Sequence, residues 1–255
     1  RNGKYDATTA PNLIKRDGFP PKRPWFLLAS PNDPAWQEVV PSMAAQYPYP
    51  LKVFMTYWSD NVYTIPGARR FEEAALRDLG KVPLFIAFDI DINETSALAD
   101  YILPEASYLE RWGTPGAAPT VVQKAQAWRQ PVVGTYDKGT ARERDASAPF
   151  DVNAPNVYTP VLPKTRTVED ILIDIGKRLN LPGIGDNALV DGSSLHTAWD
   201  WYKKLLDNTV ADAANLGIRV TPEDVVRRGG VFQSYDDAYD EGKGVLLWRV
   251  AGRTN

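Results

Sequence analysis

The fold is decided by residues 51–88, which read LKVFMTYWSDNVYTIPGARRFEEAALRDLGKVPLFIAF. The run LKVFMTYW is apolar and β-rich, and VPLFIAF is continuously apolar, as in a strand that is covered on both faces. Between them, Pro66 suits the first turn of a helix and Gly80 suits its end. The helix would bury the apolar residues that recur four apart: Phe71, Ala75 and Leu79. The stretch therefore predicts one βαβ unit.

The βαβ unit predicts a ligand-binding edge. A parallel crossover places the carboxyl ends of both strands at the same edge of the sheet, which is where ligands of open α/β sheets bind. Ser59, Asp60 and Asn61 follow the first strand, and FDIDINET, residues 88–95, follows the second. The backbone N–H groups and the amide of the first turn are suited to a ribose, a base or a phosphate.

The acidic turn after the second predicted strand holds the main candidate ligand-binding residues. Asp89, Asp91 and Asn93 alternate, so an extended backbone would point them the same way. Ionised carboxylates only accept hydrogen bonds, and two acceptors in one plane match the N–H and NH₂ donors along the edge of a guanine ring. A nucleotide base is therefore predicted to bind there.

Other interpretations of this turn remain open. A calcium loop needs Gly where Glu94 stands, and the preceding strand does not fit an EF-hand. A carboxylate pair is able to perform acid–base catalysis, although no feature of the sequence identifies a substrate. The plainest interpretation is that these are turn and cap residues, with Thr95 capping a short helix SALADYI at residues 96–102.

A second predicted helix, TVEDILIDIGKRLNLPG, has Thr167 and Asp170 at the spacing of a capping box, with Asn180 and Pro182 at its end. Its expected buried face consists of Ile171, Leu172, Ile175 and Leu179. Further helices are predicted at 194–206, 208–216 and 221–228. The last of these has Thr221 as its cap and Pro222 in its first turn.

The chain divides by composition into five segments. Nine of the 21 prolines lie within the first 50 residues, which predicts an extended arm pinned to a neighbouring surface by its aromatic residues, Trp25, Phe26 and Trp36. The expected boundaries are a Pro-rich arm at 1–50, part of an α/β domain at 51–133, a long polar loop at 134–164, a helical part packing on the same domain at 165–230, and the start of a truncated following segment at 231–255.

Composition excludes several kinds of site within these residues. There is no cysteine, which excludes disulfides, thiolate nucleophiles and Cys-ligated iron–sulfur clusters, and a single His196 leaves no histidine pair for a metal. The net charge of -3 does not favour nucleic-acid binding. No apolar run is long enough to span a bilayer, and no G-x-G-x-x-G or Walker A motif occurs. The first residue is not Met and the chain stops soon after an apolar run, so both ends are expected to be cut from a longer polypeptide.

A longer stretch resembles a known family. KVPLFIAFDIDINETSALADYILPEASYLERWG, residues 81–113, is similar to a segment of the molybdenum bis-pterin oxidoreductases of the dimethyl sulfoxide reductase family, at Asp89, Glu94, Thr95, Ala99, Asp100, Leu103 and Pro104. Upstream, Asn61 stands at the Asn of that family's Asn-Pro loop, and Val62 replaces the Pro. RQPVV and RRGGVFQSYDDAY are also similar. The likeness spans most of residues 20–240 and is greatest for catalytic subunits that reduce tetrathionate, polysulfide, thiosulfate or arsenate, especially the tetrathionate type.

The resemblance implies a Rossmann-like, three-layer α/β domain, present in part, that holds the guanosine of one molybdopterin guanine dinucleotide with molybdenum or tungsten. Asp89 and Asn61 match positions that contact the guanine in relatives. Their neighbours complete the expected cofactor-binding set: Ser59, Asp60, Asp91, Glu94 and Thr95. The metal ligand and a [4Fe-4S] cluster are expected in a missing N-terminal part, so no catalytic residue and no metal ligand is expected in this chain.

The resemblance also implies partners and a compartment. The partners are the remaining domains of the catalytic subunit, together with an iron–sulfur electron-transfer subunit, which passes electrons in anaerobic respiration, and its membrane anchor subunit. The implied compartment is the periplasm or the outer face of the cytoplasmic membrane. The parent enzyme would reduce a sulfur or arsenic oxyanion, or run in the reverse direction. The alternative is a cofactor-free structural paralogue within a respiratory complex.

Overall fold

The computed structural model describes residues 15–19, 36–65, 67–114, 125–133, 152, 161–162, 164–215, 217–232, 239–240 and 244–245. The chain divides into two compact units, Arg1–Pro104 and Glu105–Asn255, each of which is described by itself. The five segments expected from composition are finer than this division, and their boundaries stay predictions. Apart from residues 152, 161–162 and 164, the expected loop at 134–164 lies outside the described residues.

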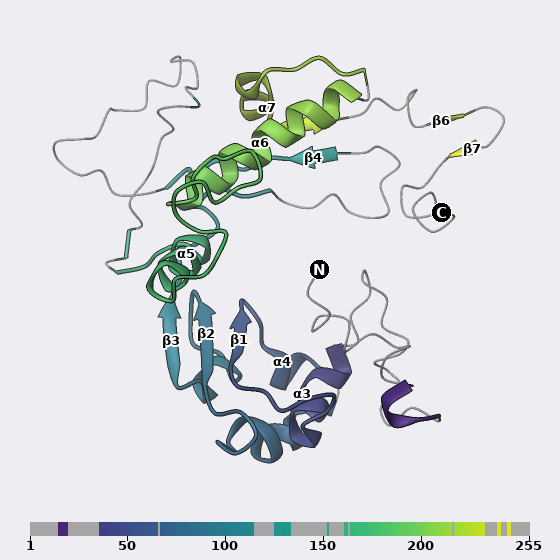
Figure 1. Cartoon of the computed structure of the whole chain (residues 1–255), viewed down its shortest axis with the longest axis vertical. Helices are drawn as coiled ribbons and strands as arrows, with labels where there is room; N and C mark the ends of the chain where they lie inside the picture. Colours follow the sequence, from purple (N-terminus) through teal and green to yellow (C-terminus); the bar gives the residue numbers. More distant parts are fainter. Residues whose placement is uncertain are drawn as a thin grey trace. The chain divides into compact units, whose positions relative to one another are not determined.

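The first unit is built on a parallel sheet. Its strands are β1 (Phe54–Tyr57), β2 (Phe85–Asp89) and β3 (Tyr101–Pro104), in the order β1-β2-β3. All three arrows point the same way in Figure 1, with Phe54 opposite Phe85 and Ile86 opposite Tyr101. The predicted α/β class and the parallel pairing of the two predicted strands are confirmed.

Strand β3 replaces most of the helix that was expected at 96–102. Only a 3₁₀ turn, η4 (Ser96–Leu98), forms there, and Ala99 is already extended, with a ψ of 147°. The pairing with β2 explains the difference: the Asp100 N–H donates to the Phe85 carbonyl at 2.9 Å, and the Phe85 N–H donates to Asp100 Oδ2 at 2.7 Å. Contacts between strands outweigh the local helical pattern here.

The connection from β1 to β2 is helical but irregular. It consists of α4 (Asn61–Thr64), the 3₁₀ helix η2 (Ala68–Phe71) and the π-helix η3 (Glu72–Leu76). Ala75 is fully buried as expected, but Leu79 is 67% exposed, and Leu76 is buried in its place. The prediction fails at Leu79 because the helix ends at Leu76 and because 3₁₀ and π turns do not keep a period of 3.6 residues. The side chain of Phe71 lies outside the described residues, so its burial stays a prediction.

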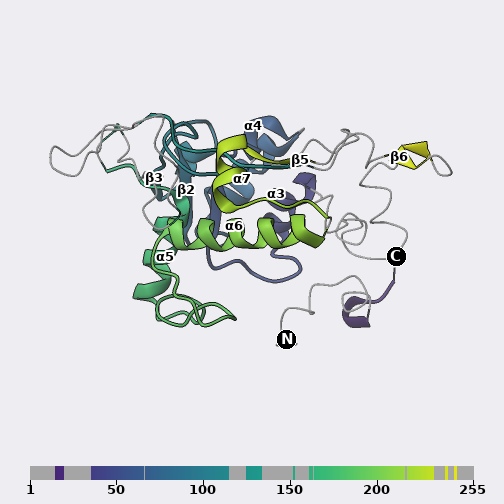
Figure 2. The ribbon, with the colours of Figure 1, turned by 90° about the horizontal axis from the view of Figure 1, so that it is seen from above.

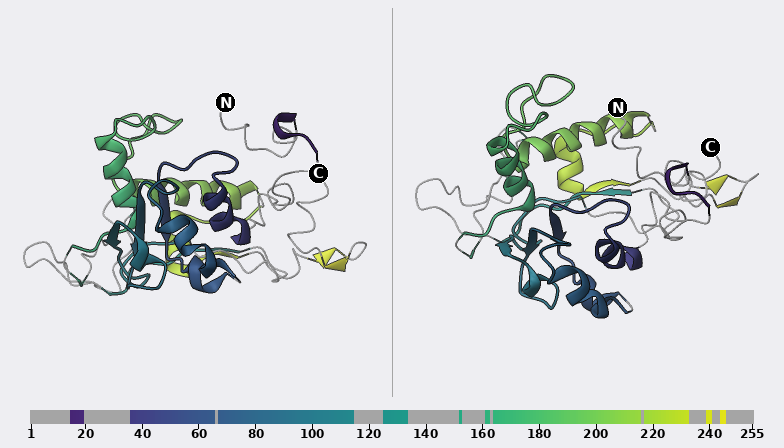
Figure 3. Two further views of the ribbon diagram at one scale, coloured as in Figure 1. Left: turned by 90° about the horizontal axis from the view of Figure 1, so that it is seen from below. Right: turned by 60° about the horizontal axis from the view of Figure 1, so that its bottom comes forward.

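The core of the first unit includes a helix that the sequence did not predict. Helix α3 (Trp36–Ala45), seen beside the sheet in Figure 3, lies within the supposed extended arm, which is wrong over this range. Its Val40 and Met43 are buried together with residues from the sheet and the connection: Val62, Ala75, Leu76, Val82 and Phe85. Trp25, Phe26 and the side chain of Trp36 lie outside the described residues, so their expected pinning role stays a prediction.

The second unit contains three helices, α5 (Val168–Arg178), α6 (Ala198–Asn215) and α7 (Pro222–Arg228). Strands β4 (Ala125–Ala127) and β5 (Gly230–Phe232) pair antiparallel, and α7 packs against both α6 and β5 (Figure 2). A further short pair joins β6 (Tyr239–Asp240) and β7 (Gly244–Val245). The helices expected at 194–206 and 208–216 are one continuous helix, α6.

The predicted side-chain caps at the starts of α5 and α7 are confirmed. The Thr167 side chain accepts a hydrogen bond from the Asp170 N–H at the start of α5. At α7, Thr221 and Asp224 form a full capping box, and Gly229 ends the helix in a left-handed conformation. Caps depend on neighbours within three residues, which explains why the sequence located them.

The buried face of α5 was predicted less well. Leu172 and Leu179 are exposed, and the buried residues are Ile173 and Gly176. A Cβ at position 176 would lie 2.1 Å from Ile184 Cδ1, so glycine lets this side chain approach the helix closely. None of the described helices is long and apolar enough to cross a membrane.

Candidate functional site

The turns after β1 and β2 lie together at the carboxyl edge of the sheet. The Trp58 N–H donates to the Phe88 carbonyl at 3.1 Å, which continues the β1–β2 pairing to the point where both strands end. Directly beyond this bond, Ser59, Asp60 and Asn61 follow one strand, and Asp89 ends the other. The predicted juxtaposition of the Asn61 and Asp89 turns is therefore found.

Thr95 joins these two turns. Its buried hydroxyl donates to Asp60 Oδ1 at 2.6 Å and accepts from the Val62 N–H at 2.9 Å. The Thr95 N–H also donates to Asp60 Oδ1, at 3.1 Å. Although Thr95 precedes η4, its hydroxyl does not cap that turn, so the predicted capping role is wrong. It instead holds the turn after β2 against the turn after β1.

Replacing Thr95 with valine is expected to destabilise the first unit by about 2 kcal/mol. Valine keeps the shape but leaves the buried Val62 N–H without its acceptor and Asp60 without one donor. Urea denaturation would measure the loss of stability, and amide hydrogen exchange would show faster exchange at Val62. Thr95→Ser, which keeps the hydroxyl, is the control. Equal protection of Val62 in both variants would contradict the role assigned to the hydroxyl.

Asp89 and Asn93 form the second part of the site. Asp89 is 5% exposed, and it accepts a hydrogen bond from the Ile90 N–H on Oδ1 at 3.0 Å and one from Asn93 Nδ2 on Oδ2 at 2.8 Å. These contacts fit the interpretation of both residues as turn residues. Since a carboxylate oxygen is able to accept two hydrogen bonds, both oxygens of Asp89 keep acceptor capacity.

Burial raises the pKa of Asp89, and the hydrogen bonds from Ile90 and Asn93 oppose that rise. The nearby charge of Asp91 raises this pKa further, whereas the backbone hydrogen bond from Asp91 lowers it. Desolvation disfavours the ionised form, while donors to the carboxylate favour it. A further donor supplied by a ligand would therefore stabilise the ionised carboxylate.

Ser59 and Asn61 provide the complementary donor. Ser59 Oγ donates to Asn61 Oδ1 at 2.7 Å, which fixes the side-chain amide. Asn61 is 8% exposed, and within the described part of the chain its Nδ2 group makes no hydrogen bond. The edge thus carries one spare amide donor and one carboxylate with spare acceptor capacity.

Asp91 and Glu94 are exposed, and neither side chain makes a hydrogen bond or ion pair in the described part of the chain. The expected alternation of Asp89, Asp91 and Asn93 does not continue, because β2 ends at Asp89 and Asn93 folds back onto it. Among the described residues, no group of three or more His, Cys, Asp or Glu side chains is placed to hold a metal ion. The assignment of Asp91 and Glu94 to a cofactor site stays a prediction.

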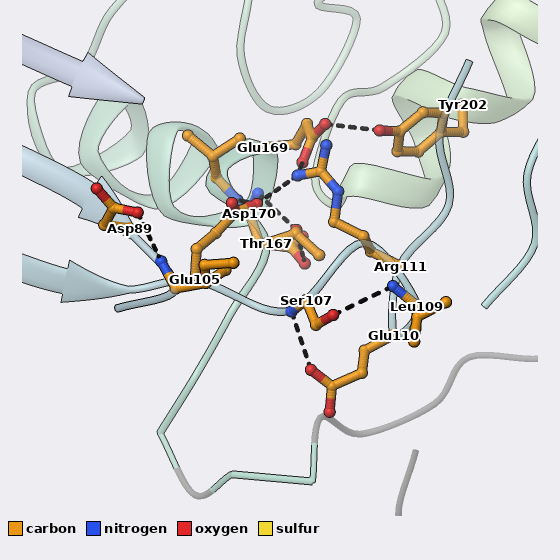
Figure 4. A network of polar contacts seen from close by, with 12 residues as sticks. Asp89, Glu105, Ser107, Leu109, Glu110, Arg111, Thr167, Glu169, Asp170 and Tyr202 are labelled. Carbon is orange, nitrogen blue, oxygen red and sulfur yellow. Dashed lines mark hydrogen bonds and ion pairs between the residues drawn. The ribbon is translucent and has the colours of Figure 1, made fainter. Parts of the chain in front are cut away.

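A buried charged network in the second unit was missed by the sequence analysis. Glu105 is ion-paired with Arg111, and Arg111 also lies 3.3 Å from Glu169 Oε2 (Figure 4). The Tyr202 hydroxyl donates to Glu169 Oε1 at 2.6 Å, and the Val168 N–H donates to Glu105 Oε1 at 3.2 Å. No local motif joins residues so far apart in sequence. The network ties the segment after β3 to α5 and α6.

Comparisons with known proteins agree with the family resemblance, although no family model matches the chain. Over 88% of the chain, it is 31% identical to the tetrathionate reductase A-subunit of Archaeoglobus fulgidus and 30% identical to the selenate reductase A-subunit of Mesobacillus selenatarsenatis. Over 74% of the chain, it is 34% identical to the tetrathionate reductase A-subunit of Salmonella typhimurium. These alignments cover 22%, 23% and 17% of the respective relatives, so the chain spans about a fifth of their length.

These matches show that the chain is homologous to part of the molybdopterin oxidoreductases. Within that family, its relatives over most of the chain are the A-subunits of tetrathionate and selenate reductases. The resemblance indicated by residues 81–113 is thereby confirmed.

Proposed function

We propose that this chain is the part of a molybdenum oxidoreductase catalytic subunit that binds the guanosine end of molybdopterin guanine dinucleotide. The observation that carries the proposal is the carboxyl edge of the sheet, where the turns bearing Asn61 and Asp89 are tied together through Thr95. This is the edge at which open α/β sheets bind nucleotides.

The groups on this edge suit a guanine base. Guanine presents a carbonyl acceptor next to an N–H and an amino donor. Asn61 Nδ2 is a spare donor for the carbonyl, and the carboxylate of Asp89 is an acceptor for the two donors. The 5% exposure of Asp89 limits contact to a small area, which suits the edge of a planar ring. Adenine has an amino donor where guanine has its carbonyl, so this donor would face the Asn61 Nδ2 donor.

The remaining predicted residues have supporting roles in this proposal. Ser59 orients Asn61, and Asp60 and Thr95 fix the two turns. The exposed carboxylates of Asp91 and Glu94 lie near the base or ribose. The bound cofactor supplies the metal that exchanges two electrons, and the residues of this chain bind and orient its guanosine.

The parent enzyme would then reduce an oxyanion of the kind that its relatives are named for, such as tetrathionate, or another sulfur or arsenic compound such as polysulfide, thiosulfate or arsenate. Electrons would arrive from an iron–sulfur partner subunit, held by a membrane anchor on the periplasmic face, and would pass through a [4Fe-4S] cluster in other domains of the catalytic polypeptide. The cluster ligands would lie outside this chain, which has no cysteine.

Replacing Asp89 with alanine in the full-length protein is expected to lower cofactor occupancy several-fold with little loss of folded protein, because the base loses its paired acceptor. The measurement is molybdenum and pterin content per polypeptide. Asp207→Ala, an exposed carboxylate on α6, is the control and should keep full occupancy. Unchanged molybdenum and pterin in Asp89→Ala would reject the proposal.

A cofactor-free structural paralogue is the second candidate. It is favoured by one observation: each oxygen of Asp89 already accepts a hydrogen bond from its own turn, as a purely structural residue would. This candidate predicts a full-length protein without molybdenum, tungsten or pterin, so the same analysis of the unmodified protein separates the two.

A further inference from the structure

Both the oxygen and the nitrogen of the Asn93 side-chain amide form hydrogen bonds. Its Oδ1 accepts hydrogen bonds from the backbone N–H groups of Thr95 at 3.0 Å and Ser96 at 2.8 Å, while Nδ2 donates to Asp89 Oδ2 at 2.8 Å. The reverse amide orientation would set Nδ2 against two N–H donors and Oδ1 against a carboxylate. The contacts therefore determine which end of the amide meets Asp89.

This arrangement fixes the plane of the Asp89 carboxylate. Asn93 Nδ2 holds one oxygen and the Ile90 N–H holds the other, so rotation of the carboxylate would break at least one bond. Because Asn93 is itself fixed by Thr95 and Ser96, the donor that orients Asp89 is preorganised. Recognition by two parallel hydrogen bonds depends on such a fixed plane, since both acceptors must meet both donors at once.

We propose that Asn93 is a positioning residue that holds the Asp89 carboxylate in the orientation needed to accept two hydrogen bonds from guanine, so that this edge selects guanine over hypoxanthine and adenine. The inference rests on the proposed function and adds an explanation of how the site prefers guanine to other purines. Hypoxanthine lacks the amino donor and would form only one of the two bonds. Adenine presents an acceptor where guanine has its ring N–H.

The test compares binding of GMP, IMP and AMP to the 255-residue chain by calorimetric or NMR titration. The unmodified chain is expected to bind GMP most tightly, IMP less tightly and AMP about tenfold or more weakly than GMP. Asn93→Asp keeps an oxygen for the Thr95 and Ser96 N–H groups but replaces the donor to Asp89 with a second acceptor. Most of the preference for GMP should then be lost. Asn208→Asp, on the exposed surface of α6, adds the same charge elsewhere and should keep the preference.

A ligand-free readout tests the positioning itself. The Asn93 hydrogen bond opposes the rise in the pKa of Asp89, so Asn93→Ala, which adds no charge, should raise that pKa further. Carboxyl-carbon NMR across a pH titration measures it. A chain that binds the three nucleotides equally would reject the proposed function, and the role of Asn93 in base selection with it. A preference for GMP that survives Asn93→Asp, or an unchanged pKa in Asn93→Ala, would overturn the inference about Asn93 alone.

Discussion

Replacing Arg111 with alanine is expected to lower the unfolding free energy of the second unit by about 3 to 5 kcal/mol. The Glu105 side chain is completely buried and that of Arg111 is 9% exposed. Burial raises the pKa of Glu105, and the charge of Arg111 is the largest influence opposing that rise. Without the guanidinium, a buried carboxylate would be left uncompensated, and Glu169 would lose the same partner.

The effect should depend on pH with a definite sign. Removing Arg111 raises the pKa of Glu105 in the folded protein still further above its unfolded value, so the stability associated with protonated Glu105 is lost as the pH rises through the folded pKa. The loss of unfolding free energy in Arg111→Ala should therefore be larger at pH 8 than at pH 5, as measured by urea denaturation.

Arg166→Ala is the control. It removes an ion pair with Asp174 whose side chains are 47% and 39% exposed, and it should cost less than about 1 kcal/mol. Equal costs for the two variants would contradict the buried-pair argument.

Replacing Gly230 with alanine is expected to cost about 3 kcal/mol or more. Gly230 has a φ of +143°, and a Cβ there would lie 2.4 Å from the Gln126 carbonyl oxygen and 3.0 Å from Ala127 Cα. Both are backbone atoms of β4, which pairs with β5. Relief of the clash would require the two strands to separate.

The neighbouring glycine provides a matched control. Gly229 has a φ of +72°, but a Cβ there would come no closer than 3.8 Å to the Trp128 carbonyl oxygen. Gly229→Ala should therefore show only the left-handed backbone penalty of about 1 to 2 kcal/mol. Thermal or urea unfolding compares the two variants. A smaller effect at 230 than at 229 would show that the β4–β5 contact is not tight.

Sequence reasoning succeeded where the determinants were local. The strands β1 and β2 were found because each is a short apolar run bounded by turn residues, and Thr167 and Thr221 were found because a cap depends on residues three positions away. It failed where partners are distant. Strand β3 forms because Asp100 bonds to Phe85, and α3 forms a core with η3 that the prolines around it did not suggest.

The same distinction applies to the candidate site. The pairing rule for parallel strands placed Asn61 and Asp89 at one edge, but the hydrogen bonds of Thr95 and Asn93 depend on how the turns fold and were not predictable from spacing. Period-2 spacing assumed that the strand continued beyond Asp89. The charged network around Glu105 includes contacts between residues 58 and 63 positions apart, Arg111 to Glu169 and Glu105 to Val168, which leave no local pattern.

The bond between Val62 and Thr95 makes the two positions interdependent. Proline, which the Asn-Pro loop of the resemblance has at this position, has no N–H to donate, so a chain carrying it would lack the bond from position 62 to the Thr95 hydroxyl. Replacing Val62 with proline would therefore remove the hydrogen bond to the Thr95 hydroxyl, while the proline ring would fix φ at position 62. With valine at position 62, the loop after β1 depends on the Thr95 hydroxyl for one of its buried hydrogen bonds, so a change at either position changes what the other must supply.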